Sequence, residues 1–171
     1  MSLSDLESNT KPSLPLPQLE WVRDLTPVQA GIDTDFLRPG VKDKSEHYRE
    51  AVHAMASLSN GVLTTAGAYS PRRLLRSLLC SVKCIYKEAK RALTENKVNK
   101  SSLDAESFLP ILTYVMVHAN LVSPCRTAFF LDEFITQYNG RTGEESYYLC
   151  SFHMAVAAVC VNMDKNEFIE T

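Results

Sequence analysis

Two carboxylates, Asp104 and Glu106, stand just before an apolar run of ten residues, and Pro110 follows Glu106 by four positions. Carboxylates are favoured at a helix start, where exposed N–H groups and the helix dipole attract negative charge. A proline in the second turn cannot donate to the carbonyl four residues back, which is that of Glu106. Capping needs only one of these side chains. At least one of the two carboxylates is therefore in excess of what capping needs, and the alternative is that both simply cap.

The five cysteines offer less chemistry than the carboxylates. Cys80 and Cys84 would share one face of a helix, but no histidine accompanies them, so we predict core thiols rather than nucleophiles. The odd count and the lack of a Cys-x-x-Cys pair argue against zinc and structural disulfides and favour reduced thiols in the cytosol. No phosphate-binding glycine loop, Gly-x-Ser-x-Gly elbow or metal-spaced His/Asp/Glu set occurs. We predict no metal and no cofactor, and expect protein binding instead.

The composition excludes several classes of protein. The chain has 171 residues, is 45% hydrophobic and 22% charged, and carries a net charge of -2. This balance is typical of a globular domain, and no single dominating basic patch suggests a nucleic-acid partner. No segment has the roughly 18 apolar residues of a membrane span, so we expect no direct membrane insertion. We predict a flexible leader at 1–16 and one helical domain at 17–171.

Apolar spacing of three and four residues predicts an all-α fold, a layered bundle of about six helices with no convincing strand. Thr26-Pro27 should start a brief helix or turn. Gly61 should cap one helix at its C-terminus, and Ser151 is a candidate break that would start a final helix. The longer helices are expected at 45–60, 70–94, 104–120, 123–139 and 147–163.

Two helices have informative faces. Residues 108–117 are apolar almost all round, which fits either a central core helix or a helix whose second face binds a partner. In the helix at 70–94, basic residues lie opposite the apolar stripe and should form a solvated face. The basic residues are Arg72, Arg73, Arg76, Lys83, Lys87 and Lys90, and the predicted core includes Leu74, Leu78, Val82, Leu112 and Val115.

Two segments carry a recognisable pattern, Ala105-Glu-Ser-Phe-Leu-Pro-Ile-Leu-Thr-Tyr-Val115 and Gly143-Glu-Glu-Ser-Tyr-Tyr-Leu-Cys-Ser151. Together they resemble the signature blocks of the Vps-nine domain family of guanine-nucleotide exchange factors. They occur in the family's order, about 30 residues apart, and the likeness extends more weakly over residues 20–163. The resemblance implies a layered helical fold whose fourth and last helices form a groove for the switch regions of early endosomal (Rab-five class) Rab GTPases.

The resemblance also implies roles for particular residues. The family's acidic finger, four positions before the helix proline, matches Glu106, where aspartate is usual, and Asp104 is the fallback finger or the helix cap. The family tyrosine of the second block matches Tyr147, and Cys150 stands where threonine or serine is usual. The implied partner-binding residues are Pro110, Thr113, Tyr114, Tyr147, Cys150 and Ser151.

These matches imply a protein that binds a nucleotide-free or GDP-bound Rab GTPase, displaces Mg²⁺ and GDP, and permits GTP loading. No covalent chemistry is involved. The alternative is a GTPase-binding adaptor with the same groove and little or no exchange activity, and a third possibility is a structural helical scaffold. We expect a cytoplasmic protein recruited to early endosomes.

Overall fold

The computed structural model describes residues 23–63, 70–121, 123–137 and 143–167, and these residues form helices and loops without a β-strand. The predicted all-α fold is thereby confirmed. The predicted leader at 1–16 lies outside the described residues, and the single domain at 17–171 stays a prediction. The α-helices are α2 (Arg49–Leu63), α3 (Pro71–Glu95), α4 (Ala105–His118), α5 (Pro124–Gln137) and α6 (Gly143–Glu167).

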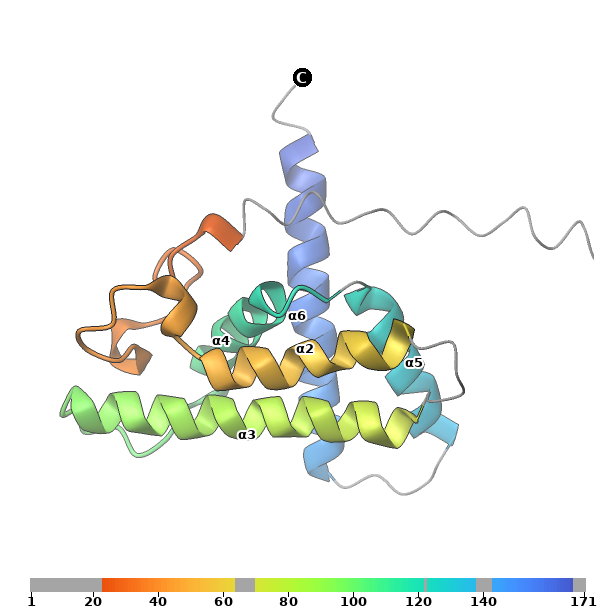
Figure 1. The fold of residues 1–171 in the computed structure, drawn as a ribbon, viewed down its shortest axis with the longest axis horizontal. Coiled ribbons are helices and arrows are strands. Elements are labelled where there is room, and N and C mark those ends of the chain that lie inside the picture. Colours follow the sequence, from red (N-terminus) through yellow and green to blue (C-terminus); the bar gives the residue numbers. More distant parts are fainter. Residues whose placement is uncertain (1–22, 64–69, 122, 138–142, 168–171) are drawn as a thin grey trace, which may run out of the picture.

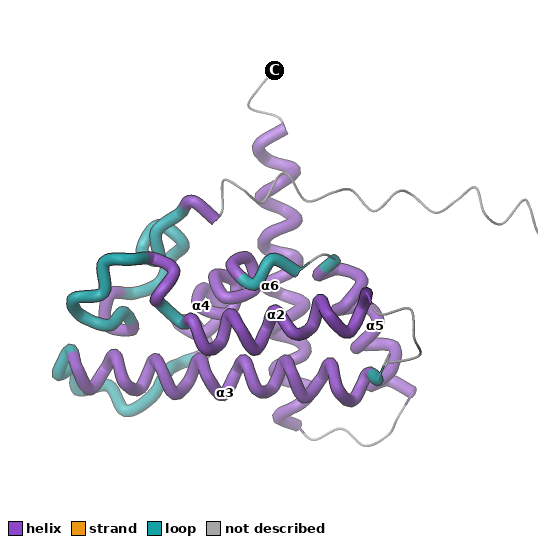
Figure 2. Tube along the Cα trace, viewed as in Figure 1, coloured by secondary structure: helices purple, strands orange, loops and turns teal. Residues whose placement is uncertain are grey.

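The helices are arranged in layers around one core. α2 and α3 lie side by side and antiparallel, and α6 crosses behind them (Figure 1). α4 packs on α6 and also contacts α2 and α3, while α5 covers another part of α6 and of α3. Loops and short 3₁₀ turns gather beside the C-terminal end of α3 (Figure 2). α4 therefore packs against three other helices, which explains why its sequence is apolar on more than one side.

α3 begins where the sequence predicted. Pro71 occupies the first helical position, and the Ser70 carbonyl accepts hydrogen bonds from the N–H groups of Arg73 and Leu74. A proline is tolerated there because its missing N–H would have no partner inside the helix. The predicted core positions in α3 and α4 are all buried, which confirms the assignment of both inward faces. They are Leu74, Leu78, Val82, Leu112 and Val115.

α2 differs from its prediction at both ends. It begins at Arg49 because Tyr48 adopts a left-handed backbone conformation, with φ of 56°, after the 3₁₀ turn Lys44–Glu46. Helical propagation from Ser45 is therefore interrupted. The prediction that Gly61 caps the helix is wrong, since α2 continues through Gly61 to Leu63.

α6 is one continuous helix, so the predicted break at Ser151 is wrong. The Ser151 hydroxyl donates to the Tyr147 carbonyl at 3.0 Å, a bond to the preceding turn that a serine inside a helix can make. α6 also begins at Gly143, four residues before the predicted start at Tyr147. The described residues therefore contain five α-helices, close to the predicted six.

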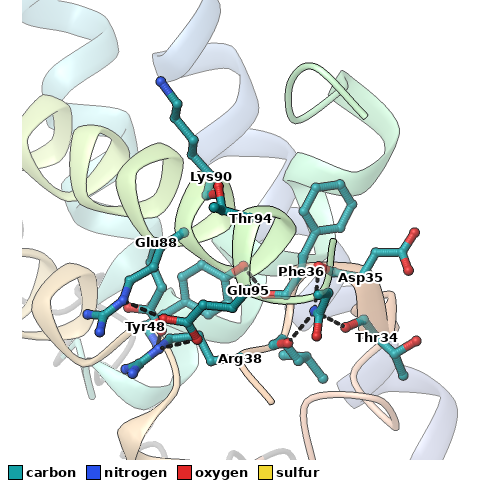
Figure 3. Close-up of polar contacts among 12 residues, drawn as sticks. Thr34, Asp35, Phe36, Arg38, Tyr48, Glu88, Lys90, Thr94 and Glu95 are labelled. Carbon is teal, nitrogen blue, oxygen red and sulfur yellow. Dashed lines mark hydrogen bonds and ion pairs between the residues drawn. The ribbon is translucent and has the colours of Figure 1, made fainter. Parts of the chain in front are cut away.

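Polar contacts hold the loop before α2 together and connect it to α3 and to Asn96 (Figure 3). The Tyr48 hydroxyl donates to the Phe36 carbonyl at 2.8 Å, and the Tyr48 N–H donates to Glu88 Oε1 at 2.7 Å. Asn96, just after α3, donates to three loop carbonyls, the shortest bond reaching Leu37 at 2.8 Å. These contacts satisfy backbone groups that regular secondary structure leaves unpaired.

The prediction of two core thiols holds only in part. Cys84 is half-buried, and burial raises the pKa of its thiol, which makes it a poor nucleophile. The prediction is wrong for Cys80, whose side chain is exposed because it lies on the solvent face of α3.

Candidate functional site

The two acidic residues at the start of α4 have different environments. Asp104 is the N-cap, and its Oδ1 accepts a 2.7 Å hydrogen bond from the Ser107 N–H. This bond holds the pKa of Asp104 below its ordinary value. Glu106 is exposed in the first helical turn, and its carboxylate has no ion pair with the described part of the chain. Asp104 thus supplies the cap, and Glu106 is left as an accessible negative charge.

Pro110 lies inside α4, one turn beyond Glu106. Having no N–H, it cannot donate to the Glu106 carbonyl, as the sequence predicted. The loop before α2 approaches this turn closely: a Cβ placed on Gly31 would lie 3.8 Å from Pro110 Cβ. Gly31 itself has φ of 89°, a backbone conformation that residues other than glycine rarely adopt.

Three aromatic rings join the start of α4 to α3 and α6. The Phe108 ring centroid lies 5.4 Å from that of Tyr86 and 5.8 Å from that of Tyr148. The ring centroids of Tyr86 and Tyr148 are 6.3 Å apart, in an edge-on arrangement. Burial raises the pKa of Tyr86 above its ordinary value. We call Tyr86, Phe108 and Tyr148 the aromatic cluster, and no sequence pattern predicts it.

The aromatic cluster connects the two parts of the candidate site, the start of α4 with Glu106 and the start of α6 with Tyr147. Phe108 follows Glu106 by two residues, and Tyr148 is the immediate neighbour of Tyr147 in the sequence. Tyr147 also packs edge-on against Tyr148, with ring centroids 5.2 Å apart. The first turn of α4 and the first turns of α6 are therefore held together by direct packing.

The outward face of α6 is uncharged for several turns. Tyr147 is 43% exposed, and Cys150 is exposed one turn further along the helix. Ser151 is buried, with its hydroxyl engaged by the Tyr147 carbonyl. Met154 is 53% exposed on the same face, a residue that sequence reasoning missed although its spacing of four from Cys150 could have revealed it.

Thr113 and Tyr114, the other residues predicted to bind a partner, have internal contacts. The half-buried Thr113 donates to the Leu109 carbonyl at 2.9 Å. Tyr114 is 3% exposed, its hydroxyl donates to the Lys44 carbonyl at 2.7 Å, and burial raises its pKa to about 12. Tyr114 thus ties α4 to the loop before α2 in this conformation, and its contact with a partner stays a prediction.

Other kinds of site are less well supported. Among the described residues, no group of three His, Cys, Asp or Glu side chains could hold a metal ion. None of the described helices has the length and apolar character needed to cross a membrane. A shallow groove of about 690 Å³ lies between α2 and the other end of α4, lined there by His118 and Ala119. It is separate from the first turn of α4.

Comparison with known proteins gives one match. Residues 57–163 match the family model of the vacuolar sorting protein 9 (VPS9) domain. The matched range contains all of α3, α4 and α5 and both sequence blocks around Glu106 and Tyr147. No curated protein and no solved structure matches the chain.

Proposed function

Because the chain belongs to the VPS9 domain family, a family of Rab exchange factors, we propose that it catalyses GDP release from a Rab GTPase of the early endosomal class. The observation that carries the proposal is that the two carboxylates at the start of α4 differ in their environments. Asp104 caps the helix, while Glu106 stands exposed and without an ion pair among the described residues. A cap alone would not require the second carboxylate.

The proposed mechanism follows from how a GTPase holds its nucleotide. A P-loop lysine contacts the phosphates, and Mg²⁺ bridges the phosphate oxygens. Glu106 would enter this site from the end of α4 and pair with the lysine in place of the phosphates. Its negative charge would also repel the departing phosphates. Mutual exclusion between the exchange factor and GDP then accelerates release, and GTP binding completes the exchange.

The outward face of α6 supplies the second part of the proposed contact. Tyr147 offers an exposed aromatic ring with a hydroxyl, a combination suited to packing on a switch region while hydrogen-bonding at its edge. Cys150, on the same face, adds a small uncharged contact. The aromatic cluster packs the first turn of α4 against the first turns of α6, which supports the proposal that one GTPase surface contacts both.

The exchange reaction is tested by loading Rab GTPases with fluorescent GDP and adding substoichiometric amounts of the protein with excess GTP. We expect accelerated release from early endosomal Rab proteins and a much smaller effect on Rab proteins of other compartments. Unchanged GDP release from every early endosomal Rab protein would reject the proposed exchange activity. The same series also identifies the preferred substrate.

A binding module without exchange activity is the second candidate. It is favoured by the residues at two positions, Glu106 where the family uses aspartate and Cys150 where it uses threonine or serine. A thiol is a weaker hydrogen-bonding group than a hydroxyl. This candidate predicts that the protein binds a nucleotide-free or GDP-bound Rab GTPase in a pull-down without accelerating release. In either case we propose a cytoplasmic protein that acts after recruitment to early endosomes.

A further inference from the structure

α3 presents a basic face that the proposed exchange reaction does not use. Its sequence contains seven lysines and arginines but only two acidic residues, whereas the whole chain has a net charge of -2. All seven basic side chains are exposed, and Cys80 is the one other exposed residue of α3 between Arg72 and Arg91. We call the seven residues the basic ridge. They are Arg72, Arg73, Arg76, Lys83, Lys87, Lys90 and Arg91.

Ion pairs neutralise only part of the basic ridge. Lys87 pairs with Glu50 of α2 at 2.9 Å, and Arg91 pairs with Glu95 at 2.8 Å. The remaining five have no ion pair within the part of the chain that the structure describes. These five side chains therefore receive no stabilisation from ion pairs within the described part of the domain, and surface ion pairs contribute little in any case.

The residues of the basic ridge lie in a line along one straight helix. It spans 20 residues, or about 29 Å at the rise of an α-helix. α3 lies along the margin of the α2–α3 layer, with its length unobstructed in the view of Figure 1. A flat, extended surface of negative charge could therefore meet all five unpaired cations at once.

We propose that the basic ridge binds the surface of an anionic lipid membrane and orients the domain there. The apolar side of α3 is buried in the core, so the helix can only adsorb through its charges and does not insert. Nucleic acid fits less well, because the ridge has no aromatic ring for base stacking and no amide side chain for reading base edges. Anionic headgroups require only dense negative charge.

The expected strength of this contact follows from the number of unpaired charges. Each lysine or arginine near an anionic bilayer increases affinity about fivefold, so removing three should weaken binding roughly a hundredfold. The test variant is Arg76→Gln/Lys83→Gln/Lys90→Gln. The matched control, Lys42→Gln/Lys97→Gln/Arg126→Gln, removes three exposed charges that lie outside α3.

The experiment is sedimentation of the protein with phosphatidylcholine vesicles, with and without added phosphatidylserine and phosphoinositide. We expect binding only to the anionic vesicles, loss of binding at 0.5 M salt, loss in the ridge variant and retention in the control. Binding to neutral vesicles, equal losses in the two triple variants, or no binding to either vesicle would overturn the proposal.

A second measurement separates the membrane from the GTPase as the occupant of the basic ridge. GDP release in solution should be the same for wild type and the ridge variant, whereas release from a GTPase tethered to anionic vesicles should be slower for the ridge variant. If GDP release in solution is also slower with the ridge variant, the basic ridge contacts the GTPase, and the proposal that it binds a membrane is rejected. The vesicle-binding result needs no GTPase, so it stands or fails separately from the proposed exchange activity.

Discussion

Replacing Phe108 with alanine should destabilise the domain far more than the same replacement at Phe129. Phe108 is 1% exposed, and its ring stacks on Tyr86 and meets Tyr148 edge-on. Deleting a buried phenylalanine ring costs about 3 to 5 kcal/mol of unfolding free energy. The two lost aromatic pairs account for about 0.5 to 1.5 kcal/mol each of this total. Phe129 of α5 is 66% exposed, so its truncation should change the free energy of unfolding by no more than about 0.5 kcal/mol.

The assay is thermal unfolding of the two variants beside wild type, followed by circular dichroism. For a domain of this size, the Phe108→Ala loss corresponds to a decrease in Tm of roughly 6 to 20 °C. Phe108→Leu keeps part of the packing and provides a folded variant if the alanine form does not express. Equal Tm values for the two alanine variants would refute the reasoning, because the aromatic cluster would then not hold α4 against α3 and α6.

Three further predictions concern the site and its support. Tyr147→Ala should weaken GTPase binding with little change in Tm, because the ring is 43% exposed; a large decrease in Tm with unchanged affinity would assign it to the core. Asp104→Ala should lower Tm more than it slows exchange, because it removes the hydrogen bond to Ser107, and the opposite pattern would make Asp104 the acidic finger. Burial raises the pKa of Glu88 above 4.5, so folding favours its protonated form and this group's contribution to stability falls as pH rises through the raised pKa. Glu88→Gln should remove that fall while keeping an acceptor for the Tyr48 N–H, and identical Tm–pH profiles for wild type and Glu88→Gln would contradict it.

The starts of α3, α4 and α5 were predictable because they depend on local chemistry. Pro71 and Pro124 stand at the first positions of α3 and α5, and the Asp104 side chain caps α4 as expected. Thr26 and Gln29 hydrogen-bond each other's backbone N–H groups, which gives the turn expected at Thr26-Pro27. In each case the residues within one turn are sufficient to determine the structure.

The incorrect predictions share a dependence on distant parts of the chain. Tyr48 takes its left-handed conformation where Glu88 and Phe36, far away in sequence, bind its N–H and hydroxyl. Ser151 can either cap a helix or bond to the preceding turn, and the neighbouring sequence alone does not decide between the two.

The candidate site combines predictable and unpredictable parts. Glu106 and Tyr147 came from the two sequence blocks, but their relation depends on the aromatic cluster, whose rings come from three different helices. Met154 extends the uncharged face of α6, and its exposure depends on which side of α6 the other helices cover. Those packing partners are not specified by the local sequence.

The most direct test of the acidic-finger mechanism is stopped-flow release of fluorescent GDP from an early endosomal Rab protein, comparing wild type with Glu106→Ala. Glu133→Ala is the matched control, because Glu133 is an exposed glutamate on α5. Glu106→Ala should cost no more than about 1 kcal/mol of stability but slow release at least about tenfold, since it removes a charge-assisted contact to the GTPase lysine. Glu106→Asp should retain exchange, and Glu133→Ala should match wild type. Wild-type release rates from a folded Glu106→Ala protein would contradict the mechanism.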